Sequence, residues 1–447
     1  MDVIFNFVNQ LNHIVWGWPM LIMLLGVGIY LSIRLKFLTL LYLPYAFKKL
    51  WHGRSASGHG AISPFQALMT AMSGTVGTGN IAGVATAIFL GGPGALFWMW
   101  VTAIMGMATS FSEAVLAVKY RDVDNKGGFH GGPMYYIKNG LGEKWKWLGS
   151  VFSFFACIAC LGTGNTIQAN SIADVLQSSF AIPPLVSGIV VMLCVGAVII
   201  GGISRIGRLA GMIVPFMTGA YILCGCLILF MHASHLIPTI KLIIESAFTP
   251  VAAQGGFVGA TVMMAIRFGM ARGVFSNEAG LGTSPIAHSS AQTNEPVHQG
   301  LIAMLGTFLD TIVVCSITGL VIISTGAWNS GESGASLTAL AFDRAFPDLG
   351  NYLIAIGLAL FAFTTTISWS YYGERSIGYL CGEKSVKYYR IIYVLIIPFG
   401  ATMNMNLIWL IADTLNALMA IPNLLALFIL SPIVVRLSQD YFSRSKL

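Results

Sequence analysis

Long apolar runs recur along the whole chain, and charged residues are almost confined to the short stretches between them. About 20 apolar residues are enough for a helix to cross a bilayer. Within lipid the backbone must satisfy its own hydrogen bonds, which restricts a spanning chain to helices or a closed barrel. Only 9% of the residues are charged, whereas a soluble domain has about 25%. The sequence therefore predicts an all-α polytopic membrane protein.

Eleven transmembrane helices are predicted from these apolar runs. They lie at about residues 17–34, 64–89, 95–118, 148–176, 184–203, 209–231, 257–287, 299–325, 350–376, 390–405 and 407–433. Residues 1–15 read as a short interfacial segment, and a further amphipathic piece is expected near residues 236–247.

Lysine and arginine divide unevenly between the two sets of alternate loops. Of the 24 basic residues, about twenty fall in one set and two in the other, while Arg267 and Arg272 lie within the seventh run. Basic loops remain on the cytoplasmic side, so we expect the N-terminus outside the cell membrane and the C-terminus inside. This distribution explains the net charge of +7 without a nucleic-acid partner. The start of the chain lacks the basic region of a cleaved signal peptide.

Two of the apolar runs contain glycine-rich interruptions of similar sequence. The second run includes Ser73-Gly74-Thr75-Val76-Gly77-Thr78-Gly79-Asn80-Ile81-Ala82-Gly83, and its end is echoed by Ser276-Asn277-Glu278-Ala279-Gly280 in the seventh run. Four glycines in one helix would each cost about 1 kcal/mol relative to alanine. Small residues can also mark a close helix–helix contact. Their recurrence in two halves of the chain favours two broken helices at a transporter binding site.

The predicted spans also suggest an internal repeat. Without the first helix, ten remain, and two groups of five must enter the membrane from opposite sides, as inverted repeats do. We therefore divide the chain into residues 1–55 (an extra N-terminal helix and cytoplasmic linker), 56–250 (a repeat broken at 73–80) and 251–447 (a repeat broken at 270–280).

A broken helix exposes N–H groups where it resumes and C=O groups where it stops. The N–H end suits a carboxylate and the C=O end suits a cation, so one break can hold a zwitterion or Na⁺. Thr75, Thr78 and Asn80 can add side-chain ligands at the first break. At the second break, the backbone of Gly273, Val274, Phe275 and Ser276 is expected to face the same site.

Other polar residues within spans could complete the site. Gln168 lies three residues after Asn165, on one helical face of the fourth span. The run Thr364-Thr365-Thr366-Ile367-Ser368-Trp369 in the ninth span offers hydroxyl oxygens, the ligands that an alkali cation prefers. These threonines could instead bond to carbonyls of their own helix.

Charged residues inside spans are candidates for function. Arg272 and Glu278 flank the second break, as a gate, a charge pair or a structural pair that does not touch ligand. Asp310 and Asp413 lie in later spans. The chain shows no Walker-A sequence, no HExxH and no nucleophile–base pair, so we do not expect an enzyme.

Three motifs together resemble the alanine-or-glycine:cation symporter family. They are Gly77-Thr78-Gly79-Asn80-Ile81-Ala82-Gly83, Gly91-Gly92-Pro93-Gly94-Ala95-Leu96-Phe97-Trp98-Met99-Trp100 and Phe275-Ser276-Asn277-Glu278-Ala279-Gly280-Leu281-Gly282. The resemblance implies Na⁺-coupled, in some members H⁺-coupled, uptake of alanine or glycine on a fold like the bacterial leucine transporter. It also implies a sodium site made by the Ser73 and Val76 carbonyls with Thr364 and Thr365, and a substrate carboxylate held at Gly79.

The sequence thus predicts a sodium-coupled symporter that imports a small neutral amino acid by alternating access, without an organic cofactor. A proton-coupled symporter, with Glu278 or Asp310 as the proton carrier, is the alternative, and an ion channel is a third possibility. The predicted substrate contacts are Thr75, Thr78, Gly79, Asn80, Gln168, Gly273, Val274, Phe275, Ser276, Thr366 and Trp369.

Overall fold

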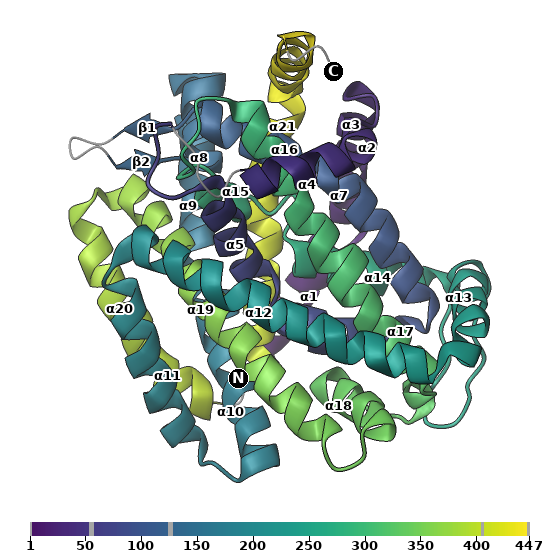
Figure 1. The fold of residues 1–447 in the computed structure, drawn as a ribbon. Coiled ribbons are helices and arrows are strands. Elements are labelled where there is room, and N and C mark those ends of the chain that lie inside the picture. The colour runs from purple at the N-terminus through teal and green to yellow at the C-terminus, as the bar shows by residue number, and fades with distance from the viewer. Residues whose placement is uncertain (1, 53–57, 124–127, 404–405, 445–447) are drawn as a thin grey trace.

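The computed structural model describes residues 2–52, 58–123, 128–403 and 406–444, and it is almost entirely helical (Figure 1). Within these residues, seven helices are long and apolar enough to cross a membrane. An eighth span is counted if Pro64–Thr75 and Gly79–Gly91, which are bent by 52° relative to each other, form one broken span. The expectation of an all-α polytopic protein is confirmed.

The chain begins with α1 (Asp2–Val15), α2 (Trp18–Arg34), α3 (Leu38–Leu41) and α4 (Leu43–His52). Together α1 and α2 provide one apolar stretch, Asn6–Arg34. Part of the segment predicted to lie at the interface is a helix of the bundle, because Asn12 donates to Thr414 Oγ1 (3.1 Å) of α21 (Asn406–Arg444). Trp16, which follows α1, donates to the Asp413 carbonyl of the same helix (2.8 Å).

The next group of elements extends to residue 248. It comprises α5 (Pro64–Thr75), the π-turn η2 (Gly79–Gly83), α6 (Val84–Gly91), α7 (Gly94–Lys119), β1 (Asp122–Val123), β2 (Phe129–His130), α8 (Pro133–Tyr136), η3 (Ile137–Leu141), η4 (Glu143–Trp145), α9 (Lys146–Leu161), η5 (Gly162–Thr166), α10 (Ile167–Phe180), α11 (Pro184–Ile199), α12 (Gly202–Met231) and α13 (Ala233–Phe248). Strands β1 and β2 pair antiparallel in a short hairpin.

The remaining elements are α14 (Val262–Asn277), α15 (Ser284–His288), α16 (Pro296–Thr307), η6 (Phe308–Cys315), α17 (Ser316–Ser324), η7 (Ala327–Asn329), α18 (Gly334–Ala345), α19 (Gly350–Cys381), α20 (Lys384–Thr402) and α21. Helix α13 agrees with the predicted amphipathic piece. Helix α18 lies between two predicted spans, in a stretch for which no helix was predicted. The helix forms there because Leu337, Ala341 and Phe342 recur at helical spacing and are buried.

The ends of the helices follow from local chemistry. At the start of α5, Ser63 and Gln66 form a reciprocal capping box, and Pro64 occupies the first helical position. Between α6 and α7, Gly92 has a φ of 71°, which allows the sharp turn at Gly91-Gly92-Pro93-Gly94.

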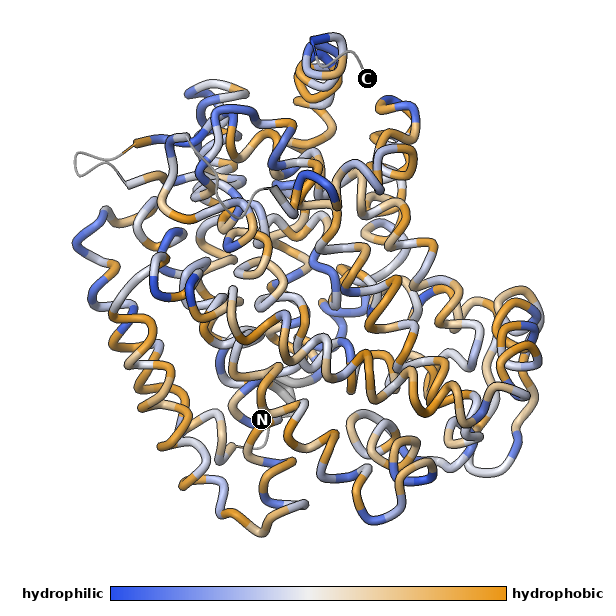
Figure 2. Tube along the Cα trace, in the orientation of Figure 1, coloured by the Kyte–Doolittle hydropathy of each residue, from blue (hydrophilic) through white to orange (hydrophobic). Residues whose placement is uncertain are grey.

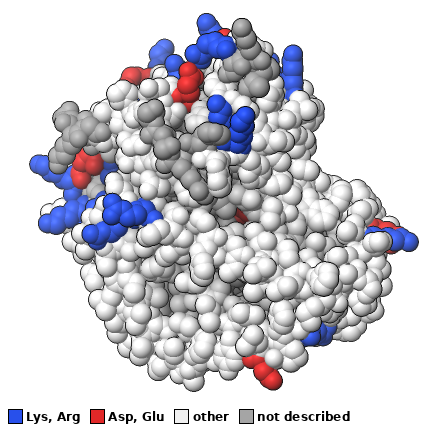
Figure 3. All heavy atoms as spheres, in the orientation of Figure 1, with Lys and Arg blue, Asp and Glu red and all other residues white. Residues whose placement is uncertain are grey.

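Most helices consist largely of hydrophobic residues (Figure 2), and large apolar side chains are exposed on them, as on a lipid-facing surface. Phe216, Phe230 and Ile237 are 74%, 80% and 80% exposed. Charged side chains gather along the upper rim and at the left of the view, and the broad face below carries few (Figure 3). The C-terminal end lies at the charged rim (Figure 1).

Candidate functional site

The first predicted break is present and lies between α5 and η2. Val76 is extended, with a ψ of 93°, and the helix resumes at Gly79. The Gly77 amide donates to Asn80 Oδ1 (2.8 Å), so the break is stabilised by a side chain of the next turn. A methyl group on Gly77 would lie 2.5 Å from Thr365 Oγ1, which places α19 directly against the break.

The second break lies further along the chain than predicted. Helix α14 continues to Asn277, and the irregular stretch is Glu278–Thr283, with Glu278 in the left-handed conformation (φ 56°). The residues at 273–276 are therefore the last turn of a helix. Gly273 lies against Thr102 of α7. A small residue was needed there for close helix packing, which explains the misplaced prediction.

Asp310 connects the two breaks. Its Oδ1 accepts from Asn80 Nδ2 (2.6 Å), and its Oδ2 accepts from Ser276 Oγ (2.8 Å) and from Thr311 Oγ1 (2.7 Å). Asn277, in turn, donates to Thr311 Oγ1 (3.1 Å). Asp310 is completely buried, and no ion pair among the described residues includes it. The site thus contains a buried carboxylate surrounded by neutral donors.

Helix α10 contributes an amide to the first break. Gln168 Nε2 donates to Thr78 Oγ1 (3.3 Å) and to the Thr163 carbonyl (3.1 Å). The Gln168 Oε1 atom is buried and has no hydrogen-bond partner within the described chain. This oxygen is an acceptor that a substrate ammonium group could use.

Only some side chains of the predicted hydroxyl run in α19 contact the first broken helix. Trp369 Nε1 donates to the Gly74 carbonyl (3.2 Å), and Ser368 Oγ contacts Ser73 Oγ. Thr364 instead faces Met217 of α12, and Thr366 Oγ1 bonds to the Ala362 carbonyl of its own helix (2.9 Å).

The oxygens available for a cation thus differ from the predicted set. Thr365 and Ser368 lie at the break beside Gly77 and Ser73, whereas the Thr364 side chain is directed toward α12. Val76 is at the break and fully buried. Hydroxyl and carbonyl oxygens from α5 and α19 fit an alkali ion.

Arg272 and Glu278 have separate partners. Arg272 pairs with Asp413 of α21 (3.8 Å), and Glu278 accepts a hydrogen bond from Thr283. The Arg272 guanidinium also lies 5.6 Å from the ring centre of Phe275, which in turn is 6.1 Å from that of Trp409. Phe275 is close to Gly79, so its ring packs against the first break.

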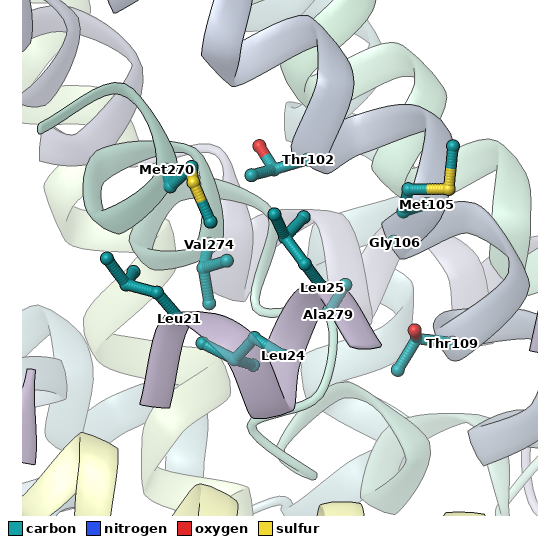
Figure 4. A pocket seen from close by; sticks show the side chains of 10 residues that line it. All are labelled: Leu21, Leu24, Leu25, Thr102, Met105, Gly106, Thr109, Met270, Val274 and Ala279. Carbon is teal, nitrogen blue, oxygen red and sulfur yellow. The ribbon is translucent and has the colours of Figure 1, made fainter. Parts of the chain in front are cut away.

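A narrow, mostly apolar cavity lies behind the second break. Helix α2 provides Leu21, Leu24 and Leu25, and the rest of the wall comes from α7, α14 and Ala279 (Figure 4). Leu24 also approaches Gly280. Helix α2 therefore packs beside the irregular backbone, and backbone breaks at membrane depth are tolerated where protein buries them.

The predicted substrate and sodium contacts did not include three of these contributors: Asp310, Ser368 and Thr163. Asp310 was singled out as a carboxylate within an apolar run and a possible proton carrier, but not as a link between the two breaks. Its position between the breaks depends on the π-turn η6, and a widened turn has no clear sequence signature.

Two interrupted helices that face each other across buried polar groups, inside a lipid-facing bundle, define a membrane transporter. The sequence profile of the sodium:alanine symporter family matches residues 1–447, and the chain belongs to this family. It is 50% identical to the sodium/alanine symporter AgcS of Methanococcus maripaludis, over 97% of this chain and 96% of that one. It is 37% identical to the probable sodium/glutamine symporter GlnT of Bacillus subtilis, over 100% and 92% of the two chains.

The fold is shared with a solved transporter of much lower similarity. The structure of MhsT in complex with L-phenylalanine superimposes with a TM-score of 0.59, covering 85% of this chain and 98% of that one, at 14% sequence identity. This confirms the expected leucine-transporter fold.

Proposed function

We propose that the protein is a sodium-coupled symporter that imports a small neutral amino acid, alanine or glycine, by alternating access. The observation that carries the proposal is the Asp310 carboxylate, buried between Asn80 and Ser276 of the two broken helices. A buried carboxylate without a basic partner is costly unless a cation or proton neutralises it. A cation bound at this position would join both breaks.

The substrate would lie between the first break and α10. The N–H groups at the start of η2, near Gly79, suit its carboxylate, and Gln168 Oε1 suits its ammonium group. A methyl group on Gly79 would be only 3.3 Å from Ser276 Cα and 3.4 Å from Phe275 Cδ1. The first break is therefore closely packed against the last turn of α14, where glycine leaves the backbone accessible.

The proposal includes the topology expected from the sequence: eleven membrane helices, arranged as one extra helix and two inverted repeats of five, with the N-terminus outside. Helices overlap every predicted span within the described residues, which supports this topology. The charged rim beside the C-terminal end in Figures 1 and 3 supports a cytoplasmic C-terminus.

Uptake of radiolabelled alanine into proteoliposomes tests this function. With an inward Na⁺ gradient, accumulation should exceed its final equilibrium level, and with K⁺ in place of Na⁺ it should not. Competition by unlabelled glycine and glutamine would rank the substrates, and we expect glycine to compete better. Equal uptake in Na⁺ and K⁺ would contradict sodium coupling.

Proton coupling is the second candidate, because a buried carboxylate can be neutralised by a proton as well as by Na⁺. An inward pH gradient without Na⁺ would then drive alanine uptake, and Asp310→Asn would abolish this drive. Single-channel current across planar bilayers would instead favour the ion-channel reading.

A further inference from the structure

The segment before α5 and the segment after α15 form a small backbone pairing outside the proposed binding site. The Ala61 amide donates to the Ser290 carbonyl (2.8 Å), and the Gln292 amide donates to the Ile62 carbonyl (2.8 Å). Ile62 and Ala291 are partners in a parallel bridge. This pairing joins the start of α5 to the end of α15 on one side of the protein.

Arg121 lies just beyond the end of α7, and its side chain bonds to both of the paired segments. Nη1 donates to the carbonyls of Ser289 (2.9 Å) and Ala291 (2.8 Å). Nη2 donates to the carbonyls of His59 (2.8 Å) and Thr293 (2.7 Å). The four N–H groups of the two terminal nitrogens match these four bonds, and only a planar guanidinium has this geometry.

The surroundings hold Arg121 in place. The guanidinium carbon lies 4.5 Å from the ring centre of Phe129 in β2, a cation–π distance. Partial burial lowers the pKa of Arg121 from its ordinary value, yet an arginine remains charged at neutral pH. Its bonds to carbonyls are therefore charge-assisted.

The contacts from these half-helices to α19 are of a different kind. They are single bonds from neutral side chains. Hydroxyl pairs join Ser290 to Tyr371 (2.7 Å) and Ser73 to Ser368, while Ser368 and Trp369 donate to the carbonyls of Thr70 (2.9 Å) and Gly74 (3.2 Å). Neutral side-chain bonds can separate and be replaced by water more easily than a backbone pairing that also carries the charge-assisted bonds of Arg121.

We infer that Arg121 is a positioning residue that joins the cytoplasmic halves of both broken helices, α5 and α15, to α7, so that they move as one body. This inference rests on the proposed transport function and on its orientation. The cytoplasmic side would then open between this body and α19, and α5 would not swing away alone. Rigid-body motion of this kind is one established route to alternating access.

A disulfide between the paired segments tests the joint motion. Ile62→Cys and Ala291→Cys are introduced together, because the two positions are bridge partners. Mild oxidation should link them, as shown by peptide mass mapping, and initial alanine uptake should be the same before and after reduction. Failure to form the disulfide, or uptake that returns only on reduction, would overturn the inference.

A second measurement needs no substrate and therefore separates this inference from the proposed function. In an Ile62→Cys variant, the introduced thiol should be buried, since Ile62 is 2% exposed. Its maleimide labelling should therefore be slow relative to that of native Cys381, which is exposed at the end of α19. Adding Arg121→Ala should raise the labelling rate at position 62, relative to that of the reference cysteine, at least about fivefold. Adding Arg121→Lys should give an intermediate value, because one ammonium group cannot reach all four carbonyls.

Arg205→Ala provides the matched control. Arg205 also donates to a carbonyl, that of Ala197 (2.6 Å), but within a single helical hairpin. Labelling at position 62 should be unchanged in this control. Alanine affinity should stay within about twofold in Arg121→Ala, while maximal uptake falls. Unchanged labelling in Arg121→Ala would overturn the role of Arg121, whatever the transported substrate.

Discussion

Asp310 accepts hydrogen bonds from side chains on three segments, η2, α14 and its own η6. It is a stronger candidate for the coupling site than several residues in the recognised motifs. The recognised motifs predicted the interruptions of the backbone, and Asp310 lies outside all of them. The carboxylate lies opposite both breaks, in a run without a glycine-rich motif; its nearest glycine is Gly306, four residues before it.

Replacing Asp310 by asparagine should weaken sodium dependence. The amide keeps the shape of the side chain but removes its charge and one acceptor. Hydrogen bonds to a charged group contribute about 1.5–3 kcal/mol, so we expect the Na⁺ concentration for half-maximal alanine binding to rise at least about tenfold. Scintillation proximity binding in detergent measures this. The exposed Asp348→Asn variant should bind normally, and unchanged Na⁺ dependence in Asp310→Asn would remove Asp310 from the coupling site.

Gln168→Ala should abolish detectable alanine binding in a protein that remains folded in detergent. The substitution removes the bond to Thr78 and the unpaired Oε1 acceptor together. Gln177→Ala, on the exposed face of the same helix, is the matched control. Normal alanine affinity in Gln168→Ala would show that α10 does not contribute to the substrate site.

At the scale of whole elements, glycine serves two different purposes in this chain, and sequence alone does not separate them. Gly77 lies in a true break, because Val76 before it is extended and the helix resumes only at Gly79. Gly273 marks close packing of α14 on α7. The first break was therefore located correctly, and the second was predicted a few residues too early. Its true position depends on Glu278, a residue not expected to adopt a left-handed conformation.

Gly77→Ala should disturb the first break rather than the fold. The added methyl group would lie 2.5 Å from Thr365 Oγ1, so α5 and α19 must move apart. We expect sodium-stimulated alanine binding to fall at least about tenfold. Gly219→Ala in α12, where nothing lies within 4 Å of the added carbon, should bind normally and be slightly more stable, since alanine favours helix by about 1 kcal/mol. Normal binding in Gly77→Ala would show that the contact with Thr365 is not required.

For the molecule as a whole, hydropathy was sufficient to predict a polytopic helical protein. It was less informative about the number of spans, because α14 and α11 are short (16 residues each) and α14 has arginines within it. The π-turns and the partners of Arg121 depend on contacts between distant segments, for which a single sequence has no local signal.

Ligand-linked stability is a prediction at this scale. A ligand that binds only the folded state at 100 times its Kd adds about 2.7 kcal/mol. Alanine with Na⁺ should therefore raise the thermal unfolding temperature in detergent, and alanine with K⁺ should not. Equal shifts in both salts would show that alanine binding is independent of Na⁺.

The contact between α1 and α21 has a consequence for biosynthesis. Asn12 and Trp16 emerge from the ribosome near the beginning, and their partners at Asp413 and Thr414 emerge about four hundred residues later. During translation α1 and α2 therefore enter the membrane before α21, and the face of α1 that packs on α21 is at first exposed to lipid. Helix α21, the last to be inserted, completes the packing of α1. A nascent chain that stops before α21 would therefore leave this face of α1 uncovered and accessible to quality-control proteases.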